Sequence, residues 1–417
     1  MKLFGTPLWL PKNITPIHPP LHGSSEDQIV IVGGSYAGLT AAYCLSKAGY
    51  SVSLLEAEMI GHAASRSAGV VCSSLERDYL DYVNNCGPEV AKRIWEFSVQ
   101  GVEFVSKLVQ QLDPNNTSAL ENTGSLYTSY PEDEAYLKAE AAARSSAGFA
   151  TQYFENKLNP FYEDGAHLGI YTPDDCIINP YAFCQVLAKA AVAQGAKIYE
   201  SSPVIHLDKE HKICKTRDGS LRGKHVILAG QCIPGQFGYI HRELELLTFC
   251  LATASLNPSQ LEALGLSKRP SFWDADQPFF YGRVTQDNRL IIGGDDLWAP
   301  MSWFGLQNVK LDRLAKRAKE RLPFLEEVPI EYSWGGPLTI MPDAIPTLGI
   351  SSGILIGGNA AGISQAVVVG KILAGMVVDC HQKVIKLFDY KRPISLIPKM
   401  YSSKELFHMI MSLIGIF

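Results

Sequence analysis

The sequence predicts an α/β fold (α+β overall), in which a Rossmann-like, doubly wound domain assembled from separated segments is joined to an antiparallel-sheet domain. The chain of 417 residues is long for one hydrophobic core, which favours two domains. Short apolar runs followed by glycine turns and apolar helical patterns recur toward both ends, as expected for buried parallel strands. Longer strand-like runs lie between them and predict the antiparallel sheet.

The first strand–helix–strand unit lies in QIVIVGGSYAGLTAAYCLSKAGYSVSLLEAE, residues 28–58. Its first strand, Ile29 to Val32, is β-branched throughout and stops at a glycine pair. Apolar residues at helical spacing follow until Gly49, and Ser51 to Leu55 form a second strand closed by Glu56. The spacing therefore predicts a βαβ unit.

Gly33, Ser35 and Gly38 occupy the positions of a dinucleotide-binding fingerprint. In this turn the first glycine makes the bend, the second lets the backbone approach a pyrophosphate, and the third lets helix pack on strand. Ser35 is small, and with allowed backbone angles its amide still points at a phosphate, so we interpret it as a tolerated departure. A carboxylate at Glu56 accepts hydrogen bonds from both ribose hydroxyls, which favours FAD or NAD over NADP. The alternative is a doubly wound core without a ligand.

Composition excludes some classes of function. A net charge of -5, with 37 basic residues spread along the chain, gives no basic stripe for nucleic acid. The nine cysteines are odd in number, lack a C-x-x-C pair and lie mostly in apolar runs, so we expect reduced thiols in a cytoplasmic protein and no metal site.

The two ends of the chain differ from the rest. Residues 1–25 are interrupted by Pro7 and Pro11 and predict an extended lead-in rather than a signal peptide. The apolar end KELFHMIMSLIGIF is too short to span a bilayer. It is either a helix docked on the protein or a peripheral contact with a membrane or a partner.

Four later segments return to the nucleotide-binding domain. The small residues of GHAASRSAGVV, 61–71, permit close approach to a ligand, and Arg66 there pairs with phosphate or a redox ring, unless the segment is a surface loop. A helix is expected from Pro180 to Gly195, and a buried strand at HVILAG. ILIGG and the helix after it repeat the fingerprint logic, with Gly358 and Gly362 closing over the cofactor.

The central runs predict an antiparallel sheet with one face to solvent. These runs are Phe249–Leu256, Phe279–Thr285, Arg289–Asp296 and Val328–Thr339. An amphipathic helix over 308–322, with Val309, Leu311, Leu314 and Ala318 on its apolar face, is expected at the edge of this sheet. The resulting boundaries are 26–105, 160–240 and 335–385 for the nucleotide domain, 106–159 and 241–334 for the substrate domain, and 386–417 for a tail.

These segments together resemble the D-amino-acid-oxidase-like (DAO) superfamily of FAD-dependent oxidoreductases, most closely the branch that includes gamma-glutamylputrescine oxidase. The resemblance covers most of the chain. It rests on the fingerprint and on PPLHG (19–23), ASRSAG (64–69), INP (178–180), VILAG, LATASL, NRLIIGGDD, and a W-G-G, T, D, P, G series formed by Trp334, Gly335, Gly336, Thr339, Asp343, Pro346 and Gly349.

The resemblance implies an activity. Members of this superfamily take a hydride from an amine C–N bond onto flavin N5, the imine is hydrolysed by water, and electrons pass to oxygen or another acceptor. The flavin supplies this chemistry, so no side-chain acid, base or nucleophile is required. The substrate is a small amine or amino acid, and no oligomeric state is implied. The implied cofactor-binding positions are Gly33, Gly34, Ser35, Tyr36, Ala37, Gly38, Glu56, Ala57, Ser65, Arg66, Ser67, Ala68, Gly69, Val204, Ala229, Gly230, Gly358, Asn359, Ala360, Ala361, Gly362 and Ile363.

Three departures from the family pattern shape the expectation. Where relatives that oxidise amino acids place a carboxylate-binding arginine, this chain has Leu338, which favours an amine or a carboxylate held elsewhere. Arg283 is the nearest candidate for such a role, or an exposed strand residue. Gly336 replaces a flavin-linking cysteine, so FAD should be non-covalent. Ala361 replaces the histidine of Gly-His-Gly, which implies altered oxygen reactivity or an inactive site.

The aromatic residues offer a place for a cationic amine. Phe272, Trp273, Phe279, Phe280 and Tyr281 present π faces or belong to the core, and strand alternation turns some of them toward the flavin. We select Tyr281 for substrate contact, with Arg283 and Arg66 as the other catalytic candidates. Alternatives to an amine oxidoreductase are a membrane-associated dehydrogenase that reduces quinone through the apolar tail, and a non-catalytic flavin-binding protein.

Overall fold

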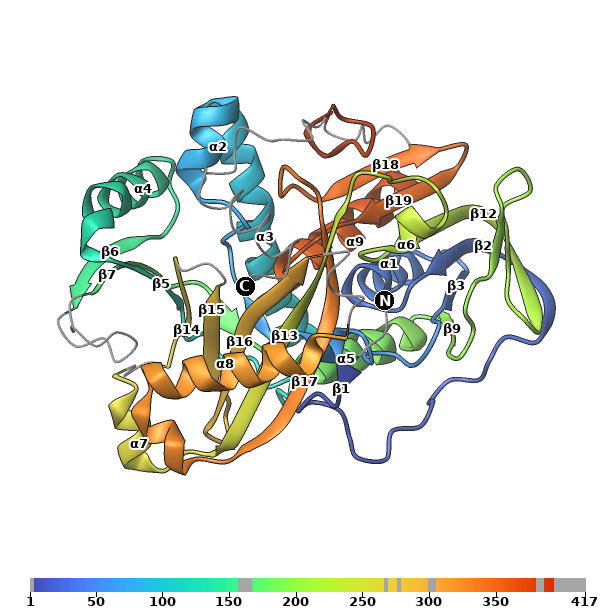
Figure 1. Cartoon of the computed structure of the whole chain (residues 1–417). Helices are drawn as coiled ribbons and strands as arrows, with labels where there is room; N and C mark the ends of the chain where they lie inside the picture. The colour runs from blue at the N-terminus through green and yellow to red at the C-terminus, as the bar shows by residue number, and fades with distance from the viewer. Residues whose placement is uncertain are drawn as a thin grey trace.

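The computed structural model describes residues 4–156, 167–265, 269–275, 279–298, 305–379 and 386–393. Two large sheets, one of eight strands and one of nine, form two halves of the molecule (Figure 1). The predicted end helix at 406–417, and all of 394–417, lie outside the described residues. Within the described ranges, no helix combines the length and apolarity needed to cross a membrane.

The eight-stranded sheet is the nucleotide half. Its order is β10-β11-β12-β2-β3-β9, and β19 pairs with the second half of β12 and with β18. The pairs that join β9, β3, β2, β12 and β19 are parallel, which confirms a doubly wound sheet assembled from separated segments. The strands are β2 (Gly23–Val32), β3 (Val52–Leu55), β9 (Lys197–Tyr199), β10 (His206–Asp208), β11 (Ile213–Lys215), β12 (Gly219–Ala229), β18 (Thr347–Ser351) and β19 (Ile354–Gly358).

Helix α1 (Tyr36–Lys47) packs against both α5 (Pro180–Ala193) and α9 (Ile363–Val378) beside this sheet, and α3 (Pro88–Leu112) packs on α9. Ten of the twelve residues of α1 are buried, as expected for a helix enclosed by neighbours on several sides. Helix α5 begins where predicted, because the Asn179 side chain accepts a 3.0 Å hydrogen bond from the Ala182 amide. These elements confirm the predicted βαβ unit and the later segments that the sequence analysis assigned to the same domain.

The nine-stranded sheet has the order β1-β17-β13-β16-β15-β14-β5-β7-β6 and is antiparallel except between β14 and β5. All four predicted central strands belong to it. Its strands are β1 (Phe4–Gly5), β5 (Ser125–Ser129), β6 (Gln152–Asn156), β7 (His167–Thr172), β13 (Leu244–Ser255), β14 (Ser271–Asp274), β15 (Phe280–Val284), β16 (Arg289–Trp298) and β17 (Ile330–Ile340). The other elements are α2 (Tyr79–Cys86), α4 (Glu134–Ser146), α7 (Pro258–Ala263), a small pair β4 (Val70–Val71) and β8 (Cys176–Ile177), and α6 (Ile233–Gln236), which contacts β12 and β19 of the eight-stranded sheet.

The prediction that one face of this sheet meets solvent was wrong at its centre. Along β13, Phe249 and its alternate neighbours pack in a core that includes Leu314 of α8 (Gln307–Arg321). Cys250 and Ala252 point the other way and pack with Trp334. Because α8 contacts the interior strands β13 and β16, it lies across the sheet face rather than at the edge (Figure 1).

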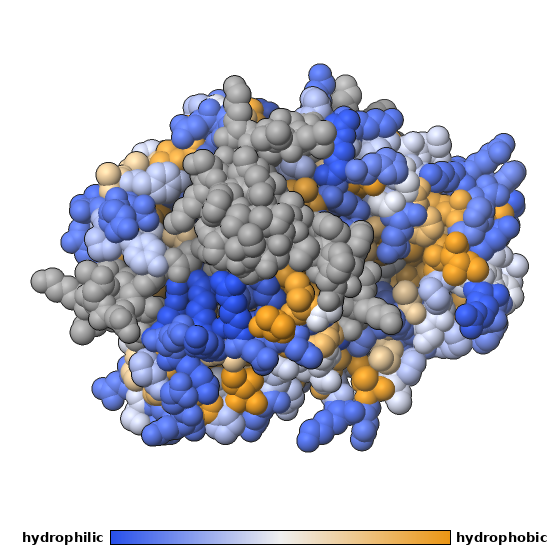
Figure 2. All heavy atoms as spheres, viewed as in Figure 1, coloured by the Kyte–Doolittle hydropathy of each residue, from blue (hydrophilic) through white to orange (hydrophobic). Residues whose placement is uncertain are grey.

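The amphipathic pattern of α8 is largely confirmed. Leu311, Leu314 and Ala318 are buried, whereas Val309, expected on the same face, is 61% exposed. In the lower part of Figure 2, where α8 lies, most of the coloured surface residues are hydrophilic, with a few hydrophobic residues among them. The helix therefore covers the sheet with one narrow apolar stripe.

The domain boundaries stay a proposal, and the structure differs from them locally. Strand β7, placed by the sequence in a nucleotide segment, pairs with β5 and β6 of the nine-stranded sheet. The extended lead-in contributes β1 to that same sheet and then reaches Glu200, whose carboxylate accepts from the Ile17 and His18 amides at 2.5 and 2.7 Å. The lead-in thus joins both halves of the molecule.

Candidate functional site

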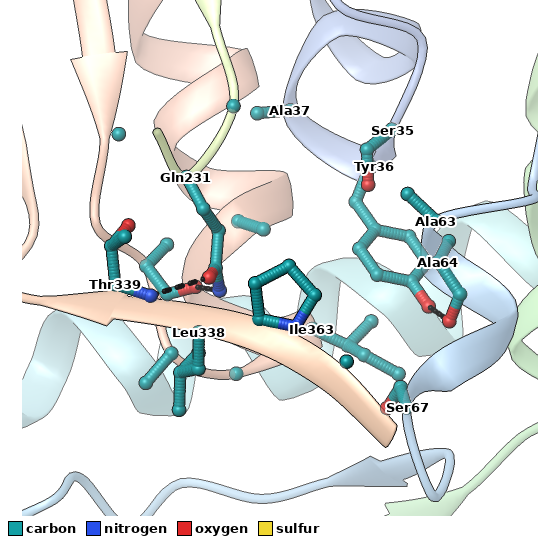
Figure 3. Close-up of a pocket in the computed structure, with 18 of the residues that line it drawn as sticks. Ser35, Tyr36, Ala37, Ala63, Ala64, Ser67, Gln231, Leu338, Thr339 and Ile363 are labelled. Atoms are coloured by element: carbon teal, nitrogen blue, oxygen red, sulfur yellow. Dashed lines mark hydrogen bonds between the residues drawn. The ribbon is translucent and has the colours of Figure 1, made fainter. Parts of the chain in front are cut away.

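A cavity of about 1030 Å³ extends between the two sheets. One end is lined by the turn after β2, the ends of β3 and β12 and the turn after β19, and the other by β5, β13, β14, β15 and β16. Figure 3 shows Ser35 and Tyr36 of the first turn facing Gln231, Leu338 and Thr339 across this space. Such a continuous volume suits a large ligand that meets a second, smaller one.

The first end is shaped by backbone. Gly33 has φ +106°, and a Cβ at this position would lie 2.2 Å from the carbonyl oxygen of Ala229, so only glycine fits. Ser35 precedes α1 with φ -95° and ψ -169°, an extended conformation open to any residue, and its side chain caps no amide. The first amides of α1 lack helical acceptors and line the cavity, which is the arrangement that binds phosphate.

Glu56 lies beside this turn. Its carboxylate accepts from the amides of Gly34 at 2.7 Å and Glu58 at 3.0 Å, and it lines the cavity. Burial raises the pKa of Glu56, although these backbone hydrogen bonds oppose the rise. A carboxylate held in this way is oriented to accept from ribose hydroxyls, so the residues present fit a dinucleotide.

The opposite rim depends on Gln231, which the sequence reasoning missed. Its Nε2 donates to the Ala360 carbonyl at 2.9 Å, and its Oε1 accepts from the Thr339 amide at 2.9 Å (Figure 3). Asn359 lies behind this rim with φ +56° and donates to Glu243 at 3.0 Å. The hydrogen bonds of Gln231 and Asn359 hold the turn after β19 in its conformation. The sequence feature that could have indicated this role is the position of Gln231, directly after the VILAG strand.

Arg66 is buried, and its guanidinium is already engaged. It donates to the carbonyls of Phe4, Gly5 and Gly335, while its Nε is buried without a hydrogen-bond partner among the described residues. Burial lowers the pKa of Arg66. Arg66 lines the cavity and donates hydrogen bonds to carbonyls of both β1 and β17, so it is not part of a surface loop.

Most of the predicted cofactor positions lie on this cavity. The positions that line it are Gly33, Gly34, Ser35, Tyr36, Ala37, Glu56, Ala57, Arg66, Ser67, Ala68, Val204, Ala229, Gly230, Gly358, Ala360, Ala361, Gly362 and Ile363. The remaining predicted positions, Gly38, Ser65, Gly69 and Asn359, are not among the lining residues but adjoin them in the chain. Their roles toward a cofactor stay a proposal.

Tyr281 marks the second end. Its phenol oxygen lies 3.2 Å from Thr248 Oγ1 and 3.5 Å from Cys250 Sγ. A Cβ on Gly293 would lie 2.1 Å from Cζ of Tyr281, so this glycine makes room for the ring. Burial raises the pKa of Tyr281 well above its usual range, which keeps the phenol protonated.

Arg283 is buried, not the exposed strand residue that the sequence left as an alternative. Its Nη1 donates to the Gly69 carbonyl at 3.0 Å, and its guanidinium lies 4.9 Å from the ring centre of Trp9. Burial lowers the pKa of Arg283 to about 9. Arg283 is not among the described residues that line the cavity, so it has no direct path to a ligand there.

The aromatic residues 279–281 divide as strand alternation predicts, because Phe279 and Tyr281 line the cavity. On β14, Trp273 lines the cavity, and its neighbour Phe272 touches the lining but also packs with Phe280 in the core. Phe280 points the other way, into the core under α8, where Arg321 lies 4.7 Å from its ring centre. Tyr127 of β5 stacks with Trp273 at 6.5 Å and adds a second ring to the wall.

Acidic residues that the sequence analysis did not identify also line the second end of the cavity. Glu76, Asp78 and Asp81, with Arg77 between them, line the cavity from the segment that leads into and begins α2. Asp296 of β16 lines it from the sheet. A pair of aspartates closing an apolar strand, in RLIIGGDD, was the signal for the last of these.

Two of these carboxyl groups have strongly raised pKa values. Burial raises the pKa of Asp296 to about 7, with the charges of Glu76 and Asp295 adding to the rise. Burial and the charge of Glu140 raise the pKa of Asp78 to about 7. Perturbed carboxyl groups in a cavity are typical of functional sites. The described residues contain no group of three metal-ligating side chains, and the eight described cysteines are free.

Comparisons with known proteins agree with this geometry. Residues 28–376 match the family model described as FAD dependent oxidoreductase. "Probable oxidoreductase OrdL" of Haemophilus influenzae is 23% identical over 384 residues, covering 88% of this chain and 86% of that protein. Gamma-glutamylputrescine oxidoreductase of Escherichia coli is 25% identical over 382 residues, covering 86% and 85%. The crystal structure of glycine oxidase from Geobacillus kaustophilus has a TM-score of 0.73 at 19% identity, covers 89% of this chain and 100% of that one, and shares the fold.

Proposed function

This chain belongs to the family of FAD-dependent oxidoreductases, and from that premise we propose that it oxidises a C–N bond of a small amine or amino-acid-like substrate. The observation that carries the proposal is the single cavity, which joins a dinucleotide-shaped turn to an end lined by aromatic rings and carboxylates. Relatives named for an oxidised amine or amino acid support the substrate class.

Bound FAD supplies a two-electron acceptor: the carbon of the C–N bond gives up a hydride, the amine becomes an imine, and water hydrolyses the imine to a carbonyl compound and free amine. Gly33, the first amides of α1 and Glu56 would hold the dinucleotide. Gln231 would hold the opposite rim in place through its bonds to Ala360 and Thr339.

The chain prepares the substrate amine. An amine gives up a hydride only as the neutral base, so the ammonium form must first lose a proton. Asp296 has a buried Oδ1 without a hydrogen-bond partner in the described part of the chain. In its ionised form this atom accepts that proton, while Tyr281 orients the amine.

An amine is favoured over an amino acid. Leu338, at the position where amino-acid oxidising relatives place an arginine, lines the cavity with an apolar side chain. Arg283 is committed to Gly69 and Trp9 away from the lining. A carboxylate at this end would meet Glu76, Asp78 and Asp296 as well as Arg77, and it would find no arginine at the Leu338 position to clamp it.

Non-covalent FAD is also proposed. Two described cysteines, Cys72 and Cys232, line the cavity. Burial raises the pKa of both thiols, and the thiol rather than the reactive thiolate is then present at neutral pH.

A visible absorption spectrum of the freshly purified chain tests the proposal first. We expect the two bands of oxidised flavin, and release of the chromophore on denaturation and filtration. Anaerobic addition of a substrate amine should then bleach the bands, and air should restore them if oxygen is the acceptor. Flavin that stays oxidised with amines, N-methyl amines and amino acids alike would overturn C–N oxidation and leave a flavin-binding protein.

A further inference from the structure

The acidic residues at the substrate end come from two separate elements. Asp296 lies on the sheet, and Glu76 lies in the segment before α2. They are close enough for the negative charge of Glu76 to raise the pKa of Asp296. Two carboxylates in one cavity are costly unless a positive charge comes between them.

Asp296 is arranged as an acceptor. Thr248 is its side-chain hydrogen-bond partner, and Thr248 Oγ1 also lies 3.2 Å from the phenol oxygen of Tyr281. An ionised carboxylate only accepts, so the single hydroxyl proton of Thr248 points to Asp296 and the phenol donates to Thr248. The lone pairs of Tyr281 and the free Oδ1 of Asp296 are then left to receive N–H groups.

The neighbouring charges leave Glu76 the more available of the outer carboxylates. Asp78 is occupied by Tyr136 Oη at 2.9 Å and by Arg144 Nη2 at 3.5 Å. Arg77, which is buried, lines the cavity beside Glu76, whereas Glu76 itself is exposed to solvent. Counting Glu76, Asp78, Asp81, Asp296 and Arg77, this end keeps an excess of negative charge when the carboxyls are ionised.

Part of the cavity wall at this end is aromatic. Tyr127 and Trp273 stack on each other and line the cavity together with Phe279. Aromatic faces attract alkylammonium cations and bury their methylene groups, whereas they offer nothing to a carboxylate. The lining thus combines two anionic positions with an apolar path.

We propose that the substrate is a diamine or polyamine without a carboxylate, whose reacting amino group meets Asp296 and whose second, cationic amino group is held by Glu76. The inference rests on the proposed function and specifies its substrate class. It follows from the presence of two acidic positions on separate elements and of aromatic rings in one cavity lining, with Leu338 in place of a carboxylate clamp.

Three ligands of similar length test the inference: 1,4-diaminobutane, butylamine and 4-aminobutanoate. Binding to the full-length, FAD-loaded protein is measured by titration calorimetry at about pH 8. We expect the diamine to bind at least about tenfold more tightly than butylamine, since the second ammonium adds a charge-assisted contact, and 4-aminobutanoate to bind most weakly. Equal affinity for diamine and butylamine, or preference for 4-aminobutanoate, would overturn the inference.

Variants locate the second amino group. Glu76→Gln should lower diamine affinity about tenfold and leave butylamine affinity within about threefold. Glu103→Gln, an exposed carboxylate on α3 paired with Lys107, is the matched control and should change neither. Thermal unfolding and flavin content verify that each variant is folded. An unchanged diamine affinity in Glu76→Gln contradicts the assignment.

Flavin bleaching separates the two proposals. Tight diamine binding without anaerobic bleaching sustains the inferred ligand class and overturns C–N oxidation. Bleaching by an amino acid, with no preference for the diamine in binding, sustains C–N oxidation and overturns the diamine inference.

Discussion

The two ends of the cavity are built in different ways. At the nucleotide end, Gly33, Ser35 and Glu56 lie within one βαβ unit, and backbone geometry does most of the shaping. At the substrate end, Glu76, Tyr281 and Asp296 come from distant segments, and side chains do the shaping. The comparison teaches that the first end tolerates little change in backbone, while the second is open to change in its side chains.

The largest effect should come from Gly33→Ala, because this variant changes the nucleotide end of the cavity, which backbone geometry shapes. A methyl group there would lie 2.2 Å from the Ala229 carbonyl, at φ +106°. We expect at least about a hundredfold loss of FAD affinity or no folded protein, measured as flavin content and by unfolding.

Gly49→Ala is the matched control for that variant. Gly49 also has a positive φ, +88°, but a Cβ there meets nothing within 4 Å. It should cost only the strain of the left-handed conformation, about 1–2 kcal/mol, and keep its flavin. If Gly33→Ala retained full flavin, the assignment of this end to backbone geometry would be wrong.

Arg66→Met tests the connection between the two ends. The guanidinium donates to three carbonyls, on β1 and β17, that would lose their partner. Unfolding in urea should show a loss of about 2–3 kcal/mol. Arg222→Met, which breaks only an exposed pair with Glu26, should change stability by less than about 0.5 kcal/mol. Similar losses in both variants would contradict a connecting role.

The pH dependence tests the side-chain-built end. The raised pKa of Asp296, about 7, means that the carboxyl is neutral below that pH and ionised above it. Amine binding should therefore strengthen roughly tenfold between about pH 6 and pH 8, since the ionised fraction rises by that factor. Titration calorimetry across this range measures the change, and Asp296→Asn should flatten the profile. A profile that keeps its shape in Asp296→Asn assigns the titration to another group.

The smallest effect should come from Ser35→Gly, which restores the usual glycine of the fingerprint. Ser35 already has extended angles and its hydroxyl caps no amide, so the backbone gains little from the change. FAD affinity, measured by quenching of flavin fluorescence, should change by less than about threefold. A tenfold gain would show that the serine weakens the nucleotide end.

The cofactor positions were predictable because their signal is local. A strand, a glycine turn, a helix and an acid in register rarely occur together by chance, and Gly33, Ser35 and Glu56, named from that pattern, line the cavity. Gln231 was missed because its role requires two partners, Thr339 and Ala360, more than a hundred residues away in sequence. The sequence left open whether Arg283 is exposed for the same reason: nothing local shows that Gly69 and Trp9 enclose it.

By itself the sequence determined the doubly wound half and the family, and it named residues that are neighbours along the chain and lie at one end of the cavity. Only the tertiary structure decided which side chains meet at the other end of the cavity, that α8 lies across a sheet with both faces covered, and that the lead-in joins the two halves. The physical reason is that periodicity and turn chemistry record local backbone preferences. Charge and packing between segments such as 76–81 and 281–296 depend on the register of strands that are paired only in the folded protein.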